Sequence, residues 1–215
     1  MGGGATIGRI IETEADLAEG AAWLAARDRH LAGALALTGL PPLRRRADGF
    51  AGLLSAIVGQ QLSVAAADTI WRRLEAAGAT SPAGLLALPD ATLRGCGLSA
   101  AKLRAARALA LAPIDHAALR LLPDEVLIAR LTALPGIGVW TAEIHALFAL
   151  GRADVFPAGD LALREAARLL FGLPARPAPA RLRAMAAAWS PWRAVAARVM
   201  WAYYRAAKQR EGVRA

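Results

Sequence analysis

The segment LPGIGVWTAEI, residues 134–144, places a proline and two glycines between two apolar stretches of helical character. Glycine accepts positive φ angles and lets another backbone approach closely, so Gly136 and Gly138 predict a tight turn. A helix that starts at Val139 presents amide N–H groups with no partner inside the helix. Such groups, with the helix dipole, bind phosphate. The segment therefore predicts a hairpin in which Gly136, Ile137 and Gly138 clamp a phosphate, although an ordinary helix-to-helix turn explains the same letters.

The rest of the chain is typical of an all-helical protein. Its 215 residues are 56% apolar and 20% charged, which are the values of an ordered globular chain. Alanine, leucine and arginine dominate, and these residues favour helix. Strict alternation of apolar and polar residues, which marks strands, is scarce. We predict an all-α fold of two helical subdomains.

Capping residues and helix breakers place the expected boundaries. Breaks rich in proline and glycine near 39–49 and 151–159 predict one subdomain from residues 1–48 and 153–215, and a central one from 49–152. The hairpin and its helices occupy about 124–149 of the central subdomain. We expect Pro191 in the first turn of the last helix. The expected N-terminal caps are Thr13 with Asp16, Ser63, Ser99 and Asp124.

Charge and cysteine content narrow the function classes. The formal net charge is +9, and residues 153–215 carry 11 basic and 4 acidic groups. This excess fits nucleic acid or an anionic membrane surface, or it serves solubility alone. Cys96 is the single cysteine, so an intramolecular disulfide and a four-cysteine cluster are excluded. We see no signal peptide and no membrane-spanning run, and expect a cytoplasmic protein with no membrane partner.

Several motifs in a fixed order accompany the hairpin. IVGQQLS (57–63) lies upstream of it, DVFPAGDLAL (154–163) follows, and PWR (191–193) precedes a tryptophan-containing final helix. Over about residues 44–210 the chain resembles the helix–hairpin–helix DNA glycosylases, most closely the 3-methyladenine DNA glycosylase II (AlkA-like) branch. The resemblance implies an all-α fold with a substrate cleft between two domains. It also implies a monomeric base excision repair enzyme that flips an alkylated purine from damaged double-stranded DNA and hydrolyses its N-glycosidic bond.

The resemblance assigns the chemistry to individual residues. Asp160 matches the catalytic aspartate, although an aspartate there is also an ordinary helix cap. Trp140 and Trp201 match positions that line the base pocket, where an aromatic face attracts a cationic alkylated base. Ile144 and Ala202 stand at pocket positions where aromatic residues are common in the family. These two departures leave the range of substrates open.

The resemblance also implies how the hairpin region engages DNA. Gln61, with Gln60 beside it, matches the side chain that fills the gap left by the flipped nucleotide, although both glutamines equally suit helix ends. No cofactor is expected. A monovalent cation is implied at the hairpin on DNA binding, on the backbone carbonyls of Thr132, Leu134 and Ile137.

Strand cleavage is not expected. Relatives that cut the strand carry a lysine where this chain has Trp140, and the two lysines here, Lys102 and Lys208, both lie far from the hairpin in the sequence, so we place neither near it. A glycosylase for oxidised or mismatched bases is one alternative. A helix–hairpin–helix module that binds DNA without catalysis is another. Release of a free base distinguishes a glycosylase from such a binding module.

Overall fold

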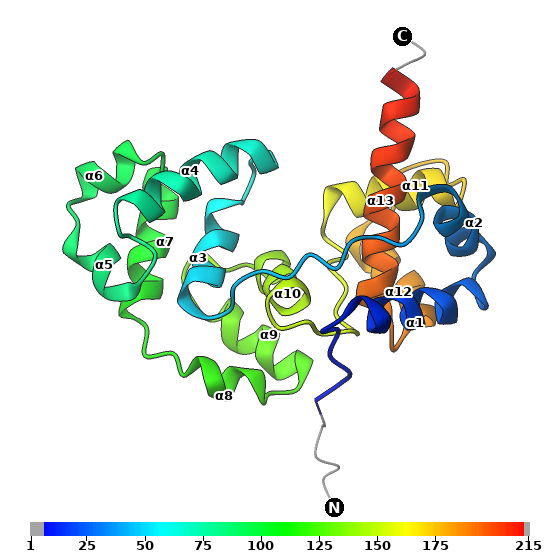
Figure 1. Cartoon of the computed structure of the whole chain (residues 1–215), viewed down its shortest axis with the longest axis horizontal. Helices are drawn as coiled ribbons and strands as arrows, with labels where there is room; N and C mark the ends of the chain where they lie inside the picture. Colours follow the sequence, from blue (N-terminus) through cyan, green and yellow to red (C-terminus); the bar gives the residue numbers. More distant parts are fainter. Residues whose placement is uncertain (1–6, 213–215) are drawn as a thin grey trace, which may run out of the picture. The chain divides into compact units, whose positions relative to one another are not determined.

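The computed structural model describes residues 7–212 and divides them into two compact units (Figure 1). The central unit is Arg46–Leu150, with which Ile7 also groups. The end unit combines Gly8–Arg45 with the described part of Gly151–Ala215. Within residues 7–212 the secondary structure is helical, apart from one isolated bridge between Ile10 and Arg152. The predicted all-α class is confirmed.

The central unit contains the consecutive helices α3 to α10. Their bounds are α3 Gly49–Val58, α4 Val64–Ala76, α5 Pro82–Ala87, α6 Asp90–Gly95, α7 Ala100–Leu111, α8 His116–Arg120, α9 Asp124–Thr132 and α10 Val139–Phe148. Helix α3 is the most apolar of them and is buried along most of its length. It packs against α7 and α10, and α9 packs against α10. The hairpin is therefore built on the core of this unit.

The end unit is assembled from both ends of the chain. Its elements are α1 Glu14–Ala25, α2 Arg29–Thr38, α11 Leu161–Leu170, α12 Pro179–Ala186, the short 3₁₀ helix Ala187–Trp189 and α13 Arg193–Gly212. Helix α13 forms its centre and packs against α1, α2 and α11. Among residues 7–212, no helix combines the length and the apolar content that crossing a lipid bilayer requires.

The observed boundaries differ slightly from the expected ones. Residues 46–48 belong to the central unit, because the Arg46 N–H donates to the Phe148 carbonyl at 2.9 Å. Residues 151–152 belong to the end unit, where Ile10 pairs with Arg152. Both contacts join residues far apart in sequence, which a local reading of breaks does not reveal. Residues 1–6 of the predicted subdomain lie outside the described residues.

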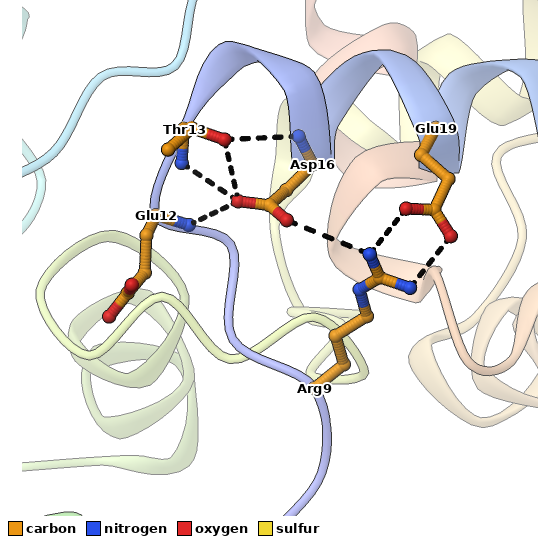
Figure 2. A network of polar contacts seen from close by, with 5 residues as sticks. All are labelled: Arg9, Glu12, Thr13, Asp16 and Glu19. Atoms are coloured by element: carbon orange, nitrogen blue, oxygen red, sulfur yellow. Dashed lines mark hydrogen bonds and ion pairs between the residues drawn. The ribbon is translucent and has the colours of Figure 1, made fainter.

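The first helix begins with the predicted capping box (Figure 2). The Asp16 N–H donates to the Thr13 hydroxyl, and the Asp16 carboxylate accepts from the Thr13 and Glu12 N–H groups at 2.9 and 3.1 Å. Arg9 binds Glu19 and lies 3.6 Å from Asp16. These hydrogen bonds hold the pKa of Asp16 below its usual value, the Thr13 hydroxyl contributing most. Local sequence thus fixes where α1 starts.

Two expected helix starts need correction. Pro191 lies before the last helix rather than in its first turn, because α13 begins at Arg193 and a turn from Trp189 to Trp192 precedes it. Asp124 is the first residue of α9, and Pro123 occupies the cap position without a side-chain hydrogen bond. The predicted caps Ser63 and Ser99 are confirmed, since each hydroxyl accepts an N–H from the first turn of its helix.

Candidate active site and nucleic-acid interface

The hairpin turn joins α9 to α10 and depends on Gly136. This residue has φ +81°, in the left-handed region where glycine is favoured. A Cβ atom at position 136 would lie 2.2 Å from the Cβ of Ala105 in α7. Ile137 is buried, and its N–H donates to the Leu134 carbonyl at 3.1 Å. The fold therefore requires a glycine at 136 both for the turn and for its packing on α7.

Gly138 stands directly before the helix that begins at Val139, where the sequence predicted it. Its φ is −83°, which any residue adopts, and a Cβ at this position would meet nothing within 4 Å. Of the two hairpin glycines, Gly136 has the positive φ and Gly138 does not. Gly138 is the N-cap of α10, and no side chain of the described residues caps that helix start. Val139 is 52% exposed. Gly138 therefore contributes no capping side chain at the start of this helix.

The turn between α3 and α4 carries the two predicted plug residues, and the structure separates their roles. Gln61 is exposed and has φ +57°, a left-handed conformation that is uncommon for a residue other than glycine. Gln60 faces the hairpin instead. Its side-chain amide donates to the Gly136 carbonyl and to the Thr141 hydroxyl, both at 2.9 Å. The plug prediction therefore stays with Gln61, at the exposed tip of the turn.

Lys102 contacts this same region, which corrects the expectation that neither lysine lies near the hairpin. Its ammonium group donates to the carbonyls of Val58 and Gln60 at 2.7 and 2.8 Å. Partial burial lowers its pKa. Lys102 belongs to α7, the helix on which Gly136 packs through Ala105. The contact joins residues more than 40 positions apart, so sequence spacing gave no signal of it.

Asp160 occupies the start of α11 in the end unit. Its carboxylate oxygen Oδ1 accepts the Leu163 N–H at 2.9 Å and the indole N–H of Trp201 at 3.1 Å. The Asp160 N–H donates to the Pro157 carbonyl at 2.9 Å, which fixes the loop before the helix. The side chain is half-buried. Asp160 is thus both a helix cap and an oriented carboxylate at the positive end of a helix dipole.

Asp154, the other carboxylate of the segment 154–163, is engaged in hydrogen bonds that hold the fold together. Arg193 donates to both of its oxygens, at 2.7 and 2.9 Å, and the Ser190 hydroxyl donates at 2.7 Å. The bidentate pair ties the loop after the central unit to the first residue of α13. Trp201, on α13, donates to Asp160, whereas Arg193 donates to Asp154. Of the two aspartates, Asp160 has the surroundings expected of a functional carboxylate.

Comparison with known proteins identifies the family. The model of the HhH-GPD superfamily of base excision DNA repair proteins matches residues 54–194. The chain belongs to this superfamily. The matched range covers the Gln60–Gln61 turn, the hairpin and Asp160, whereas Trp201 lies just beyond it.

Individual members of the superfamily are similar over most of the chain. DNA-3-methyladenine glycosylase 1 of Schizosaccharomyces pombe is 34% identical over 159 residues, which is 69% of each chain. The solved structure of the S. pombe 3-methyladenine DNA glycosylase in complex with abasic DNA has a TM-score of 0.78 at 30% identity, over 85% of this chain and 95% of that one. DNA-3-methyladenine glycosidase from Bacillus halodurans has a TM-score of 0.76 at 30% identity, covering 94% of both chains.

The remaining predicted pocket residues of this HhH-GPD protein are divided between the units. Trp140 and Ile144 lie on α10 of the central unit, where Trp140 is half-buried and Ile144 is buried. Trp201 lies on α13 of the end unit, half-buried beside Asp160. Sequence reasoning gave Trp201 only a stacking role. Its hydrogen bond to Asp160 was missed, because the two residues are 41 positions apart.

The carbonyls proposed to hold a monovalent cation fit such an ion chemically. Those of Thr132, Leu134 and Ile137 are neutral oxygen donors at the end of α9 and in the hairpin. The Leu134 carbonyl accepts the Ile137 N–H, which leaves one lone pair for an ion. The Thr132 hydroxyl donates to the Ala129 carbonyl and is turned toward its helix. Separately, no group of three or more His, Cys, Asp or Glu side chains among residues 7–212 forms a metal site.

Proposed function

We propose that this HhH-GPD protein is a DNA glycosylase that hydrolyses the N-glycosidic bond of alkylated purines, of the 3-methyladenine and 7-methylguanine class, in duplex DNA. The observation that carries the proposal is the Asp160 carboxylate, oriented by the Leu163 N–H and the Trp201 indole at the start of α11. The S. pombe relatives, named as 3-methyladenine glycosylases and in one case bound to abasic DNA, support the substrate class and the DNA partner.

The chemistry of Asp160 follows from its charge. As the bond from sugar to base breaks, the sugar develops oxocarbenium character, with positive charge near C1′. A fixed carboxylate stabilises that charge, and it can also orient or deprotonate the attacking water. An alkylated purine is already cationic and leaves readily. One carboxylate therefore suffices where sugar hydrolases usually use two.

DNA engagement is assigned to the central unit. The target bond is hidden in the base stack until the nucleotide is extruded. The amides at the start of α10, where no side chain caps the helix at Gly138, would hold a backbone phosphate. Gln61, exposed on its turn, would fill the gap in the stack. A monovalent cation on the carbonyls of Thr132, Leu134 and Ile137 would add positive charge beside that phosphate.

A base-release assay tests the proposal directly. Oligonucleotide duplexes that each contain a single 7-methylguanine, hypoxanthine, 8-oxoguanine or adenine opposite 8-oxoguanine are incubated with excess protein, and the freed base is measured by chromatography. We expect release of the methylated purine. Release of the oxidised or mispaired base alone would instead assign the protein to the other glycosylase class. Binding without release of any base would leave a non-enzymatic DNA-binding module.

The product strand is predicted to stay intact. Lys102 is the lysine of the central unit, and its ammonium group already donates hydrogen bonds to two backbone carbonyls. Borohydride added during turnover reduces any Schiff base to a stable adduct. We expect no covalent protein–DNA complex on a denaturing gel. An adduct that disappears in Lys102→Met would contradict this prediction and identify the nucleophile.

A further inference from the structure

Helix α7 supports both DNA-engaging segments of the central unit. Lys102 and Ala105 are one helical turn apart, so their side chains leave the same face. Ala105 is the residue on which Gly136 of the hairpin packs. Lys102 holds the turn that presents Gln61. One helix therefore contacts the hairpin that carries the predicted phosphate clamp and the turn that carries the predicted plug.

Hydrogen bonds connect the two segments to each other as well. The Lys102 ammonium group donates to the Gln60 carbonyl at 2.8 Å, and the Gln60 side-chain amide donates to the Gly136 carbonyl and the Thr141 hydroxyl, both at 2.9 Å. We call this set of contacts the Lys102–Gln60 bridge. Gln61 is the next residue along the chain after Gln60.

The bridge meets two physical needs of the turn. The last carbonyls of α3 have no partner inside the helix, and a cation at a helix C-terminus is stabilised by the helix dipole. Gln61 is held in the left-handed region, a conformation that persists only where the surrounding structure enforces it. Lys102 binds the carbonyls on both sides of Gly59, Val58 before it and Gln60 after it, and so fixes the backbone that leads into Gln61.

We infer that Lys102 and Gln60 are positioning residues that set the spacing between the plug, Gln61, and the phosphate clamp at Gly138. This inference rests on the proposed glycosylase function. A plug can enter the stack only at the nucleotide that leaves it, and the clamp determines which phosphate is held. A displacement of about 1 Å between such groups can cost on the order of 100-fold in rate. The bridge limits that displacement.

Paired and orphan lesions separate this role from a general structural one. Extruding a paired nucleotide requires breaking the pair, and the plug offsets that cost, whereas a lesion opposite an abasic site has no pair to break. We expect Lys102→Met to lower single-turnover base release about 10-fold on the paired lesion. On the orphan lesion the loss should be less than about threefold. Gln60→Ala should give the same pattern, because it removes the other half of the bridge.

Three further variants complete the experiment. Lys102→Arg keeps charged donors and should recover most of the paired-lesion rate. Arg104→Met, on the exposed side of α7, removes the same charge without touching the bridge and should affect both substrates little. Combined with Gln61→Ala, Lys102→Met should cause no further loss, since both changes act through the plug. If Lys102→Met does not fold, Gln60→Ala alone decides the question.

The results distinguish this inference from the proposed function. Wild-type protein that releases no methylated base refutes the proposed function, whatever the variants do. If the wild type is active, equal losses on paired and orphan lesions in the folded variants overturn the positioning role. A loss in Arg104→Met equal to that in Lys102→Met would overturn it as well, because charge alone would then explain the effect.

Discussion

Asp160 caps α11, and the same geometry suits the catalytic role proposed for it. As the N-cap of α11 it accepts the Leu163 N–H, and as a catalytic candidate it needs an oriented, charged oxygen. A cap needs only a short polar acceptor, so asparagine serves equally well. Catalysis by stabilising positive charge needs the carboxylate itself. The two roles can therefore be separated by one substitution.

Asp160→Asn is predicted to remove catalysis and leave the fold intact. We expect single-turnover base release to fall roughly 100-fold or more, which is about 3 kcal/mol of barrier. The free energy of unfolding should change by less than about 1 kcal/mol. Rapid-quench kinetics and urea titration measure the two quantities. Near wild-type release by this variant would remove Asp160 from the mechanism.

Asp154→Asn is the matched control, since it removes the other carboxylate of the same segment. It breaks the bidentate pair with Arg193, so we expect a loss of stability of about 1–3 kcal/mol. Once folded, the variant should keep most of its base-release rate. A loss of rate without a loss of stability in Asp160→Asn, and the reverse in Asp154→Asn, would separate the chemical role from the structural one.

The two hairpin glycines give a second pair of opposed predictions. Gly136→Ala combines a left-handed φ with a contact of 2.2 Å to Ala105, so it should destabilise the protein by about 2–4 kcal/mol. Gly138→Ala meets open space and should leave thermal stability unchanged. Its methyl group should instead obstruct a bound phosphate and weaken binding of damaged and undamaged duplex alike. Unchanged DNA affinity in Gly138→Ala would argue against the clamp.

At the scale of helices, the features that the sequence predicts correctly are helix starts set by hydrogen bonds between residues close in sequence. The caps Thr13, Ser63 and Ser99 were found because each bonds within its own first turn. Contacts between distant residues carry no such signal. The Lys102 contact to Gln60 and the Trp201 contact to Asp160 were therefore missed. The sequence also does not distinguish the two hairpin glycines, although Gly136 and Gly138 differ in φ and in surroundings.

Asp48 joins three helices of the central unit and was not singled out by the sequence. It caps α3, binds Arg120 at the end of α8, and lies 3.3 Å from the buried His145 Nε2 of α10. Burial alone would raise the pKa of Asp48, but hydrogen bonds from His145, Gly49 and Arg120 outweigh it and hold the pKa well below the usual value. Burial also lowers the pKa of the nearby His116. The carboxylate therefore stabilises the hairpin-bearing unit in its charged form.

The depressed pKa of Asp48 predicts a pH dependence of stability. Its contribution is fully present above the unfolded-state pKa of about 4 and is lost as the pH falls below that value. Asp48→Asn should therefore be less stable than wild type by about 2–3 kcal/mol at pH 7, and the difference should shrink between about pH 5 and pH 3. Urea unfolding at each pH measures it. Asp90 pairs with Arg107 through a side chain that is itself 67% exposed, so Asp90→Asn should cost little stability at any pH. A difference for Asp48→Asn that does not vary with pH would contradict the prediction.

On the scale of the whole molecule, the two units carry different parts of the proposed activity. The central unit holds the hairpin, the Gln61 turn and the helix that supports both. The end unit holds Asp160 and Trp201, and residues 153–215 supply 11 of the 26 basic residues of the chain. A net charge of +9 attracts DNA regardless of its sequence. Affinity and chemistry thus rest on separate features, which can be measured separately.

Salt dependence distinguishes the charge of the whole molecule from the hairpin clamp. Cationic side chains that neutralise phosphates release counterions, so the logarithm of affinity falls linearly with the logarithm of salt concentration. Wild-type affinity for duplex should fall more than roughly tenfold between 50 and 200 mM salt. The proposed clamp would use backbone amides, since no side-chain hydrogen bond caps α10 at Gly138. Gly138→Ala should therefore shift the line to weaker binding without changing its slope, whereas neutralising an arginine that binds phosphate lowers the slope by about one. Fluorescence anisotropy at five salt concentrations measures both lines. A reduced slope in Gly138→Ala would show that the hairpin acts by placing a cation, and the amide clamp would have to be abandoned.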